Sequence, residues 1–377
     1  MPTFSRPVQA ALLLICLAFA AVNLDWVMDG VRAGGDTPRY VQGGDALFGG
    51  EELTGRQLLY LGYVAVVGFF ETGGLGQSAL MLFQVAVSAL ATAAVFALAR
   101  RLAGDWAGVG AAALMATNRD IAQWNAFVLP DSLYISAVPI VIWLADRAVG
   151  RNWRGYAPAV AMLVVASTLR PNGWILALLV LTYWLLRADL RARVRIAAIA
   201  GTFALVLALV AAGPSQEDTT ETLQPAELLR AGVVVYDHPG SNLSVADDDS
   251  RSKGWAGVTS YAADHPVDTT RVLAARAVTE ILHTRKFYTA RHNRVIMVTL
   301  LPAYFFAIWG FVVCRRRPLT ILIAAVIAAH LALVAIVAAD YDGRYLLHFL
   351  PLIYVMSGAG LWDAYSRTAR RARARSA

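Results

Sequence analysis

The sequence has few charged residues, only two lysines and only two cysteines. Charged side chains make up 16% of the 377 residues and hydrophobic ones 58%, whereas about a quarter of a soluble domain is charged. This composition excludes an ordinary soluble domain and indicates a membrane protein with many spanning segments. Cys16 and Cys314 lie in or beside apolar runs, so they provide neither a disulfide framework nor a metal-ligand spacing.

Several nucleotide-binding and hydrolase motifs are also absent. The sequence contains no Walker loop, no dinucleotide glycine fingerprint, no HExxH and no nucleophile elbow. ATP-driven transport and serine hydrolysis therefore have no support. We expect no cofactor, and no ligand spacing supports a divalent metal.

Apolar runs of about 15 to 25 residues predict an all-α polytopic membrane protein with about ten spanning helices. We expect these helices at residues 8–27, 75–99, 106–124, 131–147, 156–169, 172–187, 196–212, 295–314, 319–338 and 346–363. A further apolar piece, 57–71, is too short to cross and predicts a surface-lying or half-inserted helix. The first run also has features of a signal peptide, but the rest of the chain is equally apolar, which favours a first spanning helix.

The arginines predict the orientation of the chain in the membrane. With the N-terminus inside, the inner side receives 18 of the 33 basic and four of the 26 acidic residues, a net charge of +14. The outer side then has 15 basic and 22 acidic residues, a net charge of −7. The surplus of basic residues therefore reflects the orientation of the chain in the membrane. Because these residues gather on the inner side, they do not indicate a nucleic-acid partner. We expect both termini in the cytoplasm and membrane lipids around the helices, as in a bacterial cell or inner membrane.

The predicted spans divide the chain into four parts. They are an N-terminal transmembrane module, a large outer loop, C-terminal transmembrane helices and a basic cytoplasmic tail, at residues 1–212, 213–294, 295–366 and 367–377. The first part includes the first outer loop, residues 26–74. The large outer loop is too long for a linker and has apolar residues at helical spacing over 267–284, so we expect a small outer subdomain.

The first outer loop contains "GGDTPRYVQGGDALFGG", residues 34–50, directly after the first apolar run. Asp36 suits the N-cap of a helix with Pro38 in its first turn, which is one interpretation. The other is a carboxylate at the bilayer surface that accepts a proton during a reaction. Tyr40 lies one turn later on the same helical face, and we expect Asp45 to face water.

Three further turns place polar residues at outer helix ends. "LPDSLY" puts Asp131 at the start of an inward-going helix, where capping and function weigh equally. "TLRPNGWIL" places Arg170 and Asn172 between two short helices. An outer arginine runs against the positive-inside rule, which favours function over snorkelling to headgroups. "DYDGRYLLHFLP" places Arg344 and Tyr345 before the last helix.

The segment "HTRKFYTARHNR", residues 283–294, carries basic residues just before an apolar run: Arg285, Lys286, Arg291 and Arg294. Attraction to anionic lipid headgroups is one explanation. The sharper hypothesis is a phosphate site, because arginine donors match phosphate oxygens in charge and geometry.

In combination, these motifs resemble the integral-membrane glycosyltransferases of the C-type superfamily. The branch that looks most similar is bacterial family 39, with protein mannosyltransferases and the aminoarabinose transferases of lipid A. The resemblance rests on the order of "GGDTPRYVQGGDALFGG", "LFQVAVSALATAAVFALARRLAG", "NAFVLPDSLYISAV", "LRPNGWIL" and "GRYLLHFLPLIYVMSGAG". It covers residues 8–212 and 295–363.

The resemblance implies roles for individual residues. Asp36 matches the catalytic aspartate of the family's first loop, and Asp131 matches the aspartate of its second outer loop. Arg170 and Arg344 match the arginines of two later turns. Many members have an acidic pair in the first loop, whereas here Thr37 follows Asp36, which argues against a bound metal.

The implied reaction transfers a sugar from a polyprenyl-phosphate donor to a glycan, lipid or protein acceptor on the outer face, with inversion. Asp36 would be the general base. The donor phosphate would meet Arg344, Arg170, Arg285, Lys286, Arg291 and Arg294. The expected substrate contacts are Arg39, Tyr40, Asp131, Asn172 and Tyr345.

Two other functions compete with this hypothesis. A secondary transporter or flippase for a lipid-linked sugar requires ionisable residues near the bilayer midplane, but most of those here lie at outer helix ends. A non-catalytic membrane scaffold or polymerase subunit is the third alternative. The placement of the charges favours chemistry at the membrane surface.

Overall fold

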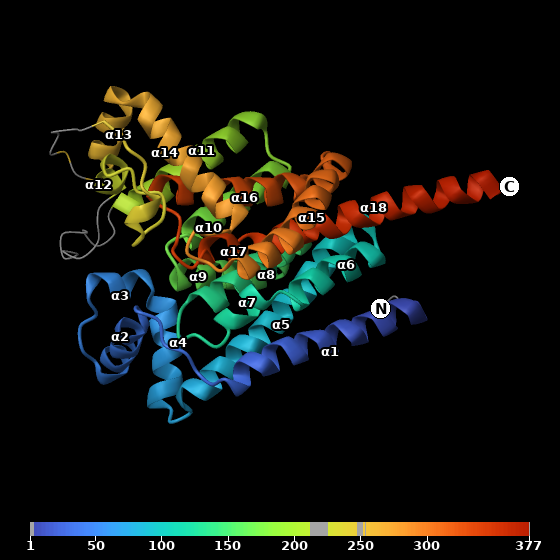
Figure 1. Cartoon of the computed structure of the whole chain (residues 1–377), viewed down its shortest axis with the longest axis horizontal. Coiled ribbons are helices and arrows are strands. Elements are labelled where there is room, and N and C mark those ends of the chain that lie inside the picture. Colours follow the sequence, from blue (N-terminus) through green and yellow to red (C-terminus); the bar gives the residue numbers. More distant parts are fainter. Residues whose placement is uncertain (1–3, 212–224, 247–251, 253, 377) are drawn as a thin grey trace. The chain divides into compact units, whose positions relative to one another are not determined.

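The computed structural model describes residues 4–211, 225–246, 252 and 254–376 (Figure 1). Within these ranges the regular elements are helices, and the isolated bridges Arg32–Phe127 and Val235–Ala339 are the extended pairings. The predicted all-α class is therefore confirmed. The first part of the predicted outer loop, residues 213–224, and its residues 247–251 and 253 lie outside the described residues.

The contacts within the chain define two compact units. Unit 1 comprises Met1–Ser215, Ala303–Val326 and Leu350–Ala377, and unit 2 comprises Gln216–Pro302 and Ile327–Phe349. Most of the predicted outer loop thus belongs to one unit, which also takes in residues that follow it in the chain. The placement of that unit outside the membrane stays a prediction.

Unit 1 contains most of the long helices (Figure 1). They are α1 (Arg6–Met28), α2 (Thr37–Gly49), α3 (Gly55–Leu59), α4 (Leu61–Thr72), α5 (Gly76–Ala103), α6 (Asp105–Ala116), α7 (Arg119–Trp124), α8 (Asp131–Ala148), α9 (Trp153–Leu169), α10 (Gly173–Arg187), α11 (Ala192–Ala211) and α18 (Leu350–Ser376). Unit 2 contains α12 (Pro225–Arg230), a 3-10 turn (Pro239–Ser241), α13 (Gly254–Asp264), α14 (Pro266–Leu282) and α17 (Arg344–Leu347). Helices α15 (Ala290–Cys314) and α16 (Pro318–Val337) contribute residues to both units.

Four described helices are long and apolar enough to cross a membrane: α1, α5, α15 and α16. They coincide with four of the predicted spans. The side chains of α1 are almost all at the surface, and only Val8 and Asn23 are buried along it. An apolar helix with so little buried surface suits a lipid environment, so these helices support an integral membrane protein. The predicted number of ten spans stays a prediction.

Two predicted helices are interrupted. The expected span 106–124 is wrong as one helix, because α6 ends at Ala116 and α7 begins at Arg119. Asn118 causes the break: its Oδ1 accepts from the Ile121 N–H at 2.6 Å and caps α7. The expected surface helix 57–71 is likewise divided between α3 and α4.

The end of the chain differs from the expectation in a similar way. The predicted last span, 346–363, begins as the short α17 and continues in α18. The predicted basic tail, 367–377, is helical as far as Ser376. Arginine and alanine are good helix formers, and the arginine Nε–aspartate bond from Arg367 to Asp363 at 2.7 Å joins two successive turns.

Helix α2 packs closely on α4 through two glycines. A Cβ atom added to Gly44 would lie 2.8 Å from the Cα of Gly68, which leaves no room for a larger residue. Gly44, the second glycine of "VQGGDALF", and Gly68 thus allow the backbones of α2 and α4 to touch. This contact holds α2 against α4 within residues 26–74.

Unit 2 is held by an arginine in its interior. Arg276 of α14 is fully buried, and its Nε donates to the Val233 carbonyl at 2.7 Å. Its Nη1 donates to the carbonyls of Ala335 and Ile336 at 3.1 and 2.7 Å, at the C-terminal end of α16. A cation suits a helix C-terminus because the last carbonyls lack partners within the helix. The amphipathic pattern of 267–284 gave no sign that this arginine faces inward.

Candidate active site

The loop after α1 is attached by its backbone to the loop between α7 and α8. The Arg32 N–H donates to the Ala126 carbonyl at 2.8 Å, and the Val128 N–H donates to the Arg32 carbonyl at 3.0 Å. The Thr37 hydroxyl donates to the Val128 carbonyl at 3.0 Å and accepts from the Gly34 N–H at 2.8 Å. These bonds bring the beginning of α2 close to the beginning of α8, although Thr37 and Val128 are 91 residues apart.

Asp36 occupies the N-cap position of α2, but its side chain makes no capping hydrogen bond. Its Oδ1 lies 2.9 Å from Nη1 of Arg39, and the side chains of Asp36 and Arg39 are 37% and 28% exposed. The capping interpretation therefore does not account for the carboxylate, which lies at the surface. Asp45, further along α2, is exposed as predicted.

Tyr40 lies in the interior behind Asp36. It is 2% exposed and packs edge-to-face on Tyr60 and Tyr63, with ring centroids 5.4 and 5.1 Å away. Burial raises the pKa of the Tyr40 hydroxyl well above its ordinary value, and the charge of Arg170 opposes that rise. The charges of Asp36 and Asp131 also raise this pKa. Both aspartates that the sequence predicted therefore lie close enough to Tyr40 to affect its ionisation.

Asp131 and Arg170 form an ion pair in the interior of unit 1. Their side chains are 1% and 7% exposed, and Nη1 of Arg170 donates to Oδ1 of Asp131. Arg170 ends α9 in an extended conformation because the following Pro171 disfavours the helical one. The chain then turns, and the Asn172 carbonyl accepts from the Ile175 N–H at 3.2 Å as α10 begins.

The structure thus brings together Asp36, Arg39, Tyr40, Asp131 and Arg170, five of the residues predicted from the sequence. We call them the aspartate cluster. Asp36 and Arg39 are partly exposed, whereas Tyr40, Asp131 and Arg170 are buried. A substrate that approaches from solvent therefore meets Asp36 and Arg39 first, and direct contact with Tyr40 or Asp131 stays a prediction.

A buried amide network beneath this cluster was missed by the sequence analysis. The Gln84 Nε2 donates to the carbonyls of Asn125 and Phe127 at 2.9 and 3.0 Å. The Asn125 side chain donates to Asn23 Oδ1 at 2.7 Å and accepts from the Ser132 hydroxyl at 2.5 Å. These bonds fix the loop that leads into Asp131. The available signal was the presence of Asn23 and Gln84 inside long apolar runs, where polar residues are costly.

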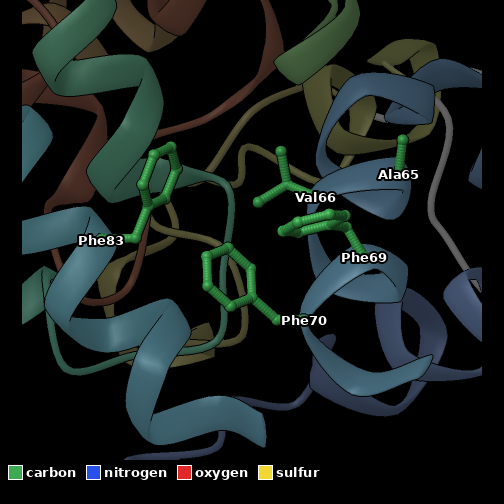
Figure 2. Close-up of a pocket in the computed structure, with 5 residues that line it drawn as sticks. All are labelled: Ala65, Val66, Phe69, Phe70 and Phe83. Carbon is green, nitrogen blue, oxygen red and sulfur yellow. The ribbon is translucent and has the colours of Figure 1, made fainter. Parts of the chain in front are cut away.

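An apolar groove of about 340 Å³ opens between α4 and α5. It is lined by Ala65, Val66, Phe69, Phe70 and Phe83. Figure 2 shows Val66, Phe69 and Phe70 projecting from α4 toward the ring of Phe83 on α5. The same helix α4 also carries Tyr63, which packs on Tyr40 about one turn before the groove.

Unit 2 contains a second constellation of charges. Glu280 of α14 is fully buried; its Oε1 accepts from the Leu346 N–H at 2.5 Å, and its Oε2 lies 3.4 Å from Nη2 of Arg285. Arg285 also donates through Nη1 to the Thr279 carbonyl at 2.7 Å and through Nη2 to the Asp340 carbonyl at 3.0 Å. The Arg285 guanidinium group is therefore buried and bonded within unit 2. Its contact with a donor phosphate stays a prediction.

The turn before α17 presents Arg344 at the edge of this network. Asp340 accepts from the N–H groups of Asp342 and Arg344 at 3.0 and 3.3 Å, and from Arg344 Nε at 3.0 Å. Gly343 has φ +69°, a conformation that residues with a side chain rarely adopt. Arg344 is 21% exposed, and its guanidinium carbon lies 5.7 Å from the ring centroid of Tyr345. We call Glu280, Arg285, Asp340 and Arg344 the arginine cluster.

Burial shifts the pKa values of two groups of unit 2 in opposite directions. The pKa of Glu280 rises to about 7 through burial, although the charge of Arg285 counteracts the rise. The pKa of His283 falls to about 3 through burial, and the positive charge of Arg285 lowers it further. Both groups are thus held neutral more strongly than they would be in water.

The remaining basic residues of the 283–294 segment lie at the surface. Lys286, Arg291 and Arg294 are exposed. Asn293 clamps the segment, because its side chain donates to the Arg285 carbonyl at 2.8 Å and accepts from the Arg285 N–H at 3.2 Å. Within the described residues, no group of three or more His, Cys, Asp or Glu side chains is placed to hold a metal ion.

Comparison with known proteins adds two matches. Residues 62–213 match a family model described as dolichyl-phosphate-mannose-protein mannosyltransferase. The fold is similar to that of ArnT from Cupriavidus metallidurans, in a crystal structure with bound undecaprenyl phosphate, with a TM-score of 0.51 and 16% sequence identity. The similarity covers 93% of this chain, which spans 60% of the length of that one. No curated protein matches the chain.

These matches confirm the resemblance to the C-type glycosyltransferases that the ordered motifs indicated. The segment that matches the family model contains Asp131, Arg170 and Asn172, whereas Asp36 precedes it and the arginine cluster follows it. The similarity to the solved structure is one of fold. The roles of individual residues therefore rest on their geometry.

Proposed function

We propose that this protein is a membrane glycosyltransferase that moves a sugar from a polyprenyl-phosphate donor to an acceptor hydroxyl. The family match and the fold shared with a protein crystallised with undecaprenyl phosphate support this class of donor. The observation that carries the proposal is the carboxylate of Asp36, which is partly exposed, makes no capping bond and lies over the buried Tyr40, Asp131 and Arg170.

In the proposed reaction, Asp36 accepts the proton of the acceptor hydroxyl while the hydroxyl oxygen attacks the anomeric carbon. The bond from that carbon to the phosphate oxygen breaks, and polyprenyl phosphate leaves with the bonding electrons. This single displacement inverts the anomeric configuration. Asp131 is less suited to the base role because its side chain is 1% exposed and is already paired with Arg170.

Cations stabilise the negative charge that develops on the leaving phosphate. Arg344 is our first candidate in unit 2, since its side chain reaches the surface, where it is 21% exposed beside Asp340. Lys286, Arg291 and Arg294 are exposed and can adjust to a phosphate group. For the buried Arg170 and Arg285 we propose an electrostatic contribution from the interior, where charges are poorly screened.

The groove between α4 and α5 suits the hydrocarbon part of the donor. Its lining is apolar, and α4 leads from the groove to Tyr63 and the aspartate cluster. We propose that the first isoprene units lie against Phe69, Phe70 and Phe83, with the active site on the outer face of a bacterial membrane. The arginine asymmetry of the sequence supports this orientation.

The decisive experiment compares the purified full-length protein with Asp36→Asn and Asp45→Asn, using defined polyprenyl-phospho-sugars and candidate acceptors. We expect Asp36→Asn to lower kcat on the order of 10²- to 10⁴-fold, as loss of a general base does. Asp45→Asn is the matched control: it lies on the same helix, is exposed, and should leave kcat unchanged.

Undiminished transfer by Asp36→Asn would exclude the base role. Failure of the wild-type protein with every polyprenyl-phospho-sugar, together with sugar-lipid flux in proteoliposomes, would instead support the transporter alternative. Thermal unfolding of each variant shows whether a loss of transfer reflects a loss of structure.

A further inference from the structure

A basic cleft lies within unit 1 between the C-terminal end of α15, the turn that follows it and α18, and the proposed reaction does not use it. The cleft has a volume of about 450 Å³ and is lined by Val312, Val313, Cys314, Arg315, Arg316, Arg317 and Arg367. The three consecutive arginines form the turn from α15 to α16, and Arg367 comes from α18. Two segments 50 residues apart in the chain thus place their guanidinium groups around one hollow.

The cleft lies at the opposite end of the unit 1 helices from the aspartate cluster. Helix α6 contacts α18 at both of its ends: Asn118, just after α6, donates to the Tyr354 hydroxyl at 2.7 Å, and Trp106, in its first turn, stacks on Trp362. The aspartate cluster is attached near the first of these ends, through the loop that follows α7. Arg367 lies beyond the second end, about 8 Å past Trp362 along α18.

Aromatic residues mark the depth of this end in a membrane. The rings of Trp106 and Trp362 are stacked with centroids 6.4 Å apart, and those of Trp362 and Tyr365 with centroids 5.6 Å apart. Trp309 of α15 donates through its indole N–H to Asp363 at 2.9 Å. Trp and Tyr gather at the level of lipid headgroups. The arginines of the cleft lie within about two helical turns of these rings along α15 and α18. This spacing places the arginines at the level of lipid phosphates.

The charges of the cleft are unbalanced. No carboxylate lines it, and Asp363, four residues before Arg367 on α18, already accepts from Trp309 Nε1 and from Arg367 Nε at 2.9 and 2.7 Å. Arg315, Arg316 and Arg317 are exposed, and one Arg315 donor, Nη1, bonds the Val312 carbonyl at 3.2 Å. A site with this surplus of guanidinium groups favours a phosphate anion.

The walls of the cleft decide between a free and a lipid-borne phosphate. Val312 and Val313 are 54% and 39% exposed beside the arginines. The exposed apolar surface continues along α15 through Trp309, Ile308 and Phe305, at 40%, 66% and 61%. In a membrane this surface lies against acyl chains, so a phosphate that is carried by a lipid can reach the arginines while its chains cover the apolar wall.

We propose that this cleft binds the phosphate headgroup of an anionic membrane phospholipid, with its acyl chains along α15. The bound lipid joins the α15–α16 turn to α18 and so stabilises the end of unit 1 remote from the aspartate cluster. The proposal does not depend on the glycosyltransferase assignment, because its evidence comes from the cleft itself.

The test uses the purified full-length protein, delipidated and then returned to phosphatidylcholine nanodiscs with or without phosphatidylglycerol. Native mass spectrometry counts retained phosphatidylglycerol, and thermal unfolding reports the shift in Tm. We expect the wild type to retain phosphatidylglycerol and to gain Tm. We expect the triple variant R315Q/R316Q/R317Q to bind it about 10- to 100-fold more weakly, because charge-assisted bonds are lost.

The matched control is R370Q/R371Q/R373Q, which removes the same charge from exposed positions of α18 outside the cleft lining. It should retain the lipid and the Tm gain. If the triple variant does not unfold cooperatively in phosphatidylcholine, the single variant Arg316→Gln replaces it. We then expect phosphatidylglycerol to bind several-fold more weakly than to the wild type. Equal loss in the control would show diffuse attraction of charge and overturn the site. An equal Tm gain from inorganic phosphate, or undiminished retention by the cleft variants, would overturn it too.

Discussion

The aspartate cluster of unit 1 and the arginine cluster of unit 2 have the same construction but expose opposite charges. Each couples a buried ion pair to a partly exposed one: Asp131–Arg170 with Asp36–Arg39, and Glu280–Arg285 with Asp340–Arg344. In unit 1 the more exposed member of the outer pair is the carboxylate of Asp36, at 37%, against 28% for Arg39. In unit 2 it is Arg344, at 21%, against 9% for Asp340.

This difference is consistent with the division of roles that we propose. A general base must be reached by the proton that it accepts, and the carboxylate that unit 1 exposes would meet this requirement. A phosphate ligand must present a cation, and the guanidinium group that unit 2 exposes would meet that one. In unit 2 the buried pair bonds the backbone beside the exposed one, through the Leu346 N–H and the Asp340 carbonyl. The buried pairs should therefore govern stability and the exposed pairs activity.

The largest effect on stability is expected from opening the buried pair of unit 1. Arg170→Met leaves the Asp131 carboxylate in the interior without its cation, which typically costs about 3–5 kcal/mol. Thermal unfolding in a fixed detergent measures the loss. The double variant Asp131→Leu/Arg170→Met should recover much of it, because it buries no lone charge. A single variant as stable as the wild type would show that the pair does not hold the cluster together.

The pH dependence of unit 2 should show two opposing contributions. The raised pKa of Glu280, about 7 against 4.5, contributes stability that is present below pH 4.5 and lost as pH rises through 7. The lowered pKa of His283, about 3 against 6.5, contributes stability that is present above pH 6.5 and lost as pH falls through 3. Between pH 4.5 and 6.5 the two largely cancel, so these groups leave the wild-type stability nearly flat.

Glu280→Gln separates these contributions. It removes the carboxylate but retains an acceptor for the Leu346 N–H, so that only the His283 contribution remains. Stability should then rise on the order of 3 kcal/mol from pH 4.5 to 6.5. Urea unfolding at several pH values provides the measurement, and His283→Asn should show the reverse slope. A flat profile for Glu280→Gln would argue against the buried neutral histidine.

A smaller effect is expected at the turn that presents Arg344. Gly343→Ala forces a side chain into φ +69° and toward the His283 ring, which lies 2.5 Å from where the Cβ atom would be. We expect a loss of about 1–3 kcal/mol in stability. Gly50→Ala is a useful comparison, because its φ of +76° is similar but nothing lies within 4 Å of the added Cβ. Equal losses would mean that the neighbouring histidine adds nothing.

The smallest effects on stability are expected for the exposed pairs. Arg39→Gln should change the free energy of unfolding by less than about 1 kcal/mol, as is usual for surface ion pairs. Arg344→Gln should cost about 1 kcal/mol, because the Asp340 carboxylate is only 9% exposed but keeps its bonds from the Asp342 and Arg344 N–H groups. Arg344→Gln should nevertheless lower kcat/KM for the polyprenyl-phospho-sugar, since it removes a proposed phosphate ligand. Steady-state kinetics with varied donor would test this, and unchanged kcat/KM would remove Arg344 from the proposed mechanism.

Much of the helical content could be predicted, because a long apolar run in a membrane leaves the backbone no partner but itself. The predicted runs 8–27 and 75–99 correspond closely to α1 and α5. The break at Asn118 was missed, since a single capping side chain interrupts an otherwise apolar segment. The second half of the predicted outer loop contains α13 and α14, and the helical spacing over 267–284 predicted the latter.

For the candidate site, residue types were easier to predict than their environments. Glycine and proline around Asp36, Asp131, Arg170 and Arg344 marked turns at helix ends, and these residues do lie at or beside helix ends. The exposure of these side chains could not be predicted from the sequence, because it depends on which helices cover each side chain. Arg170 and Arg285 thus look as accessible in sequence as Arg344, but both are buried.

By itself, the sequence determined that the chain is helical and suited to a membrane, and it determined which residue types stand at the helix ends. These properties depend on composition and on local spacing. Only the tertiary structure decided that Asp36 is reachable while Asp131 is not, and that Glu280 and Arg276 are interior residues. The reason is physical: burial depends on segments far apart in the chain, such as Thr37 with Val128, or Leu346 with Glu280.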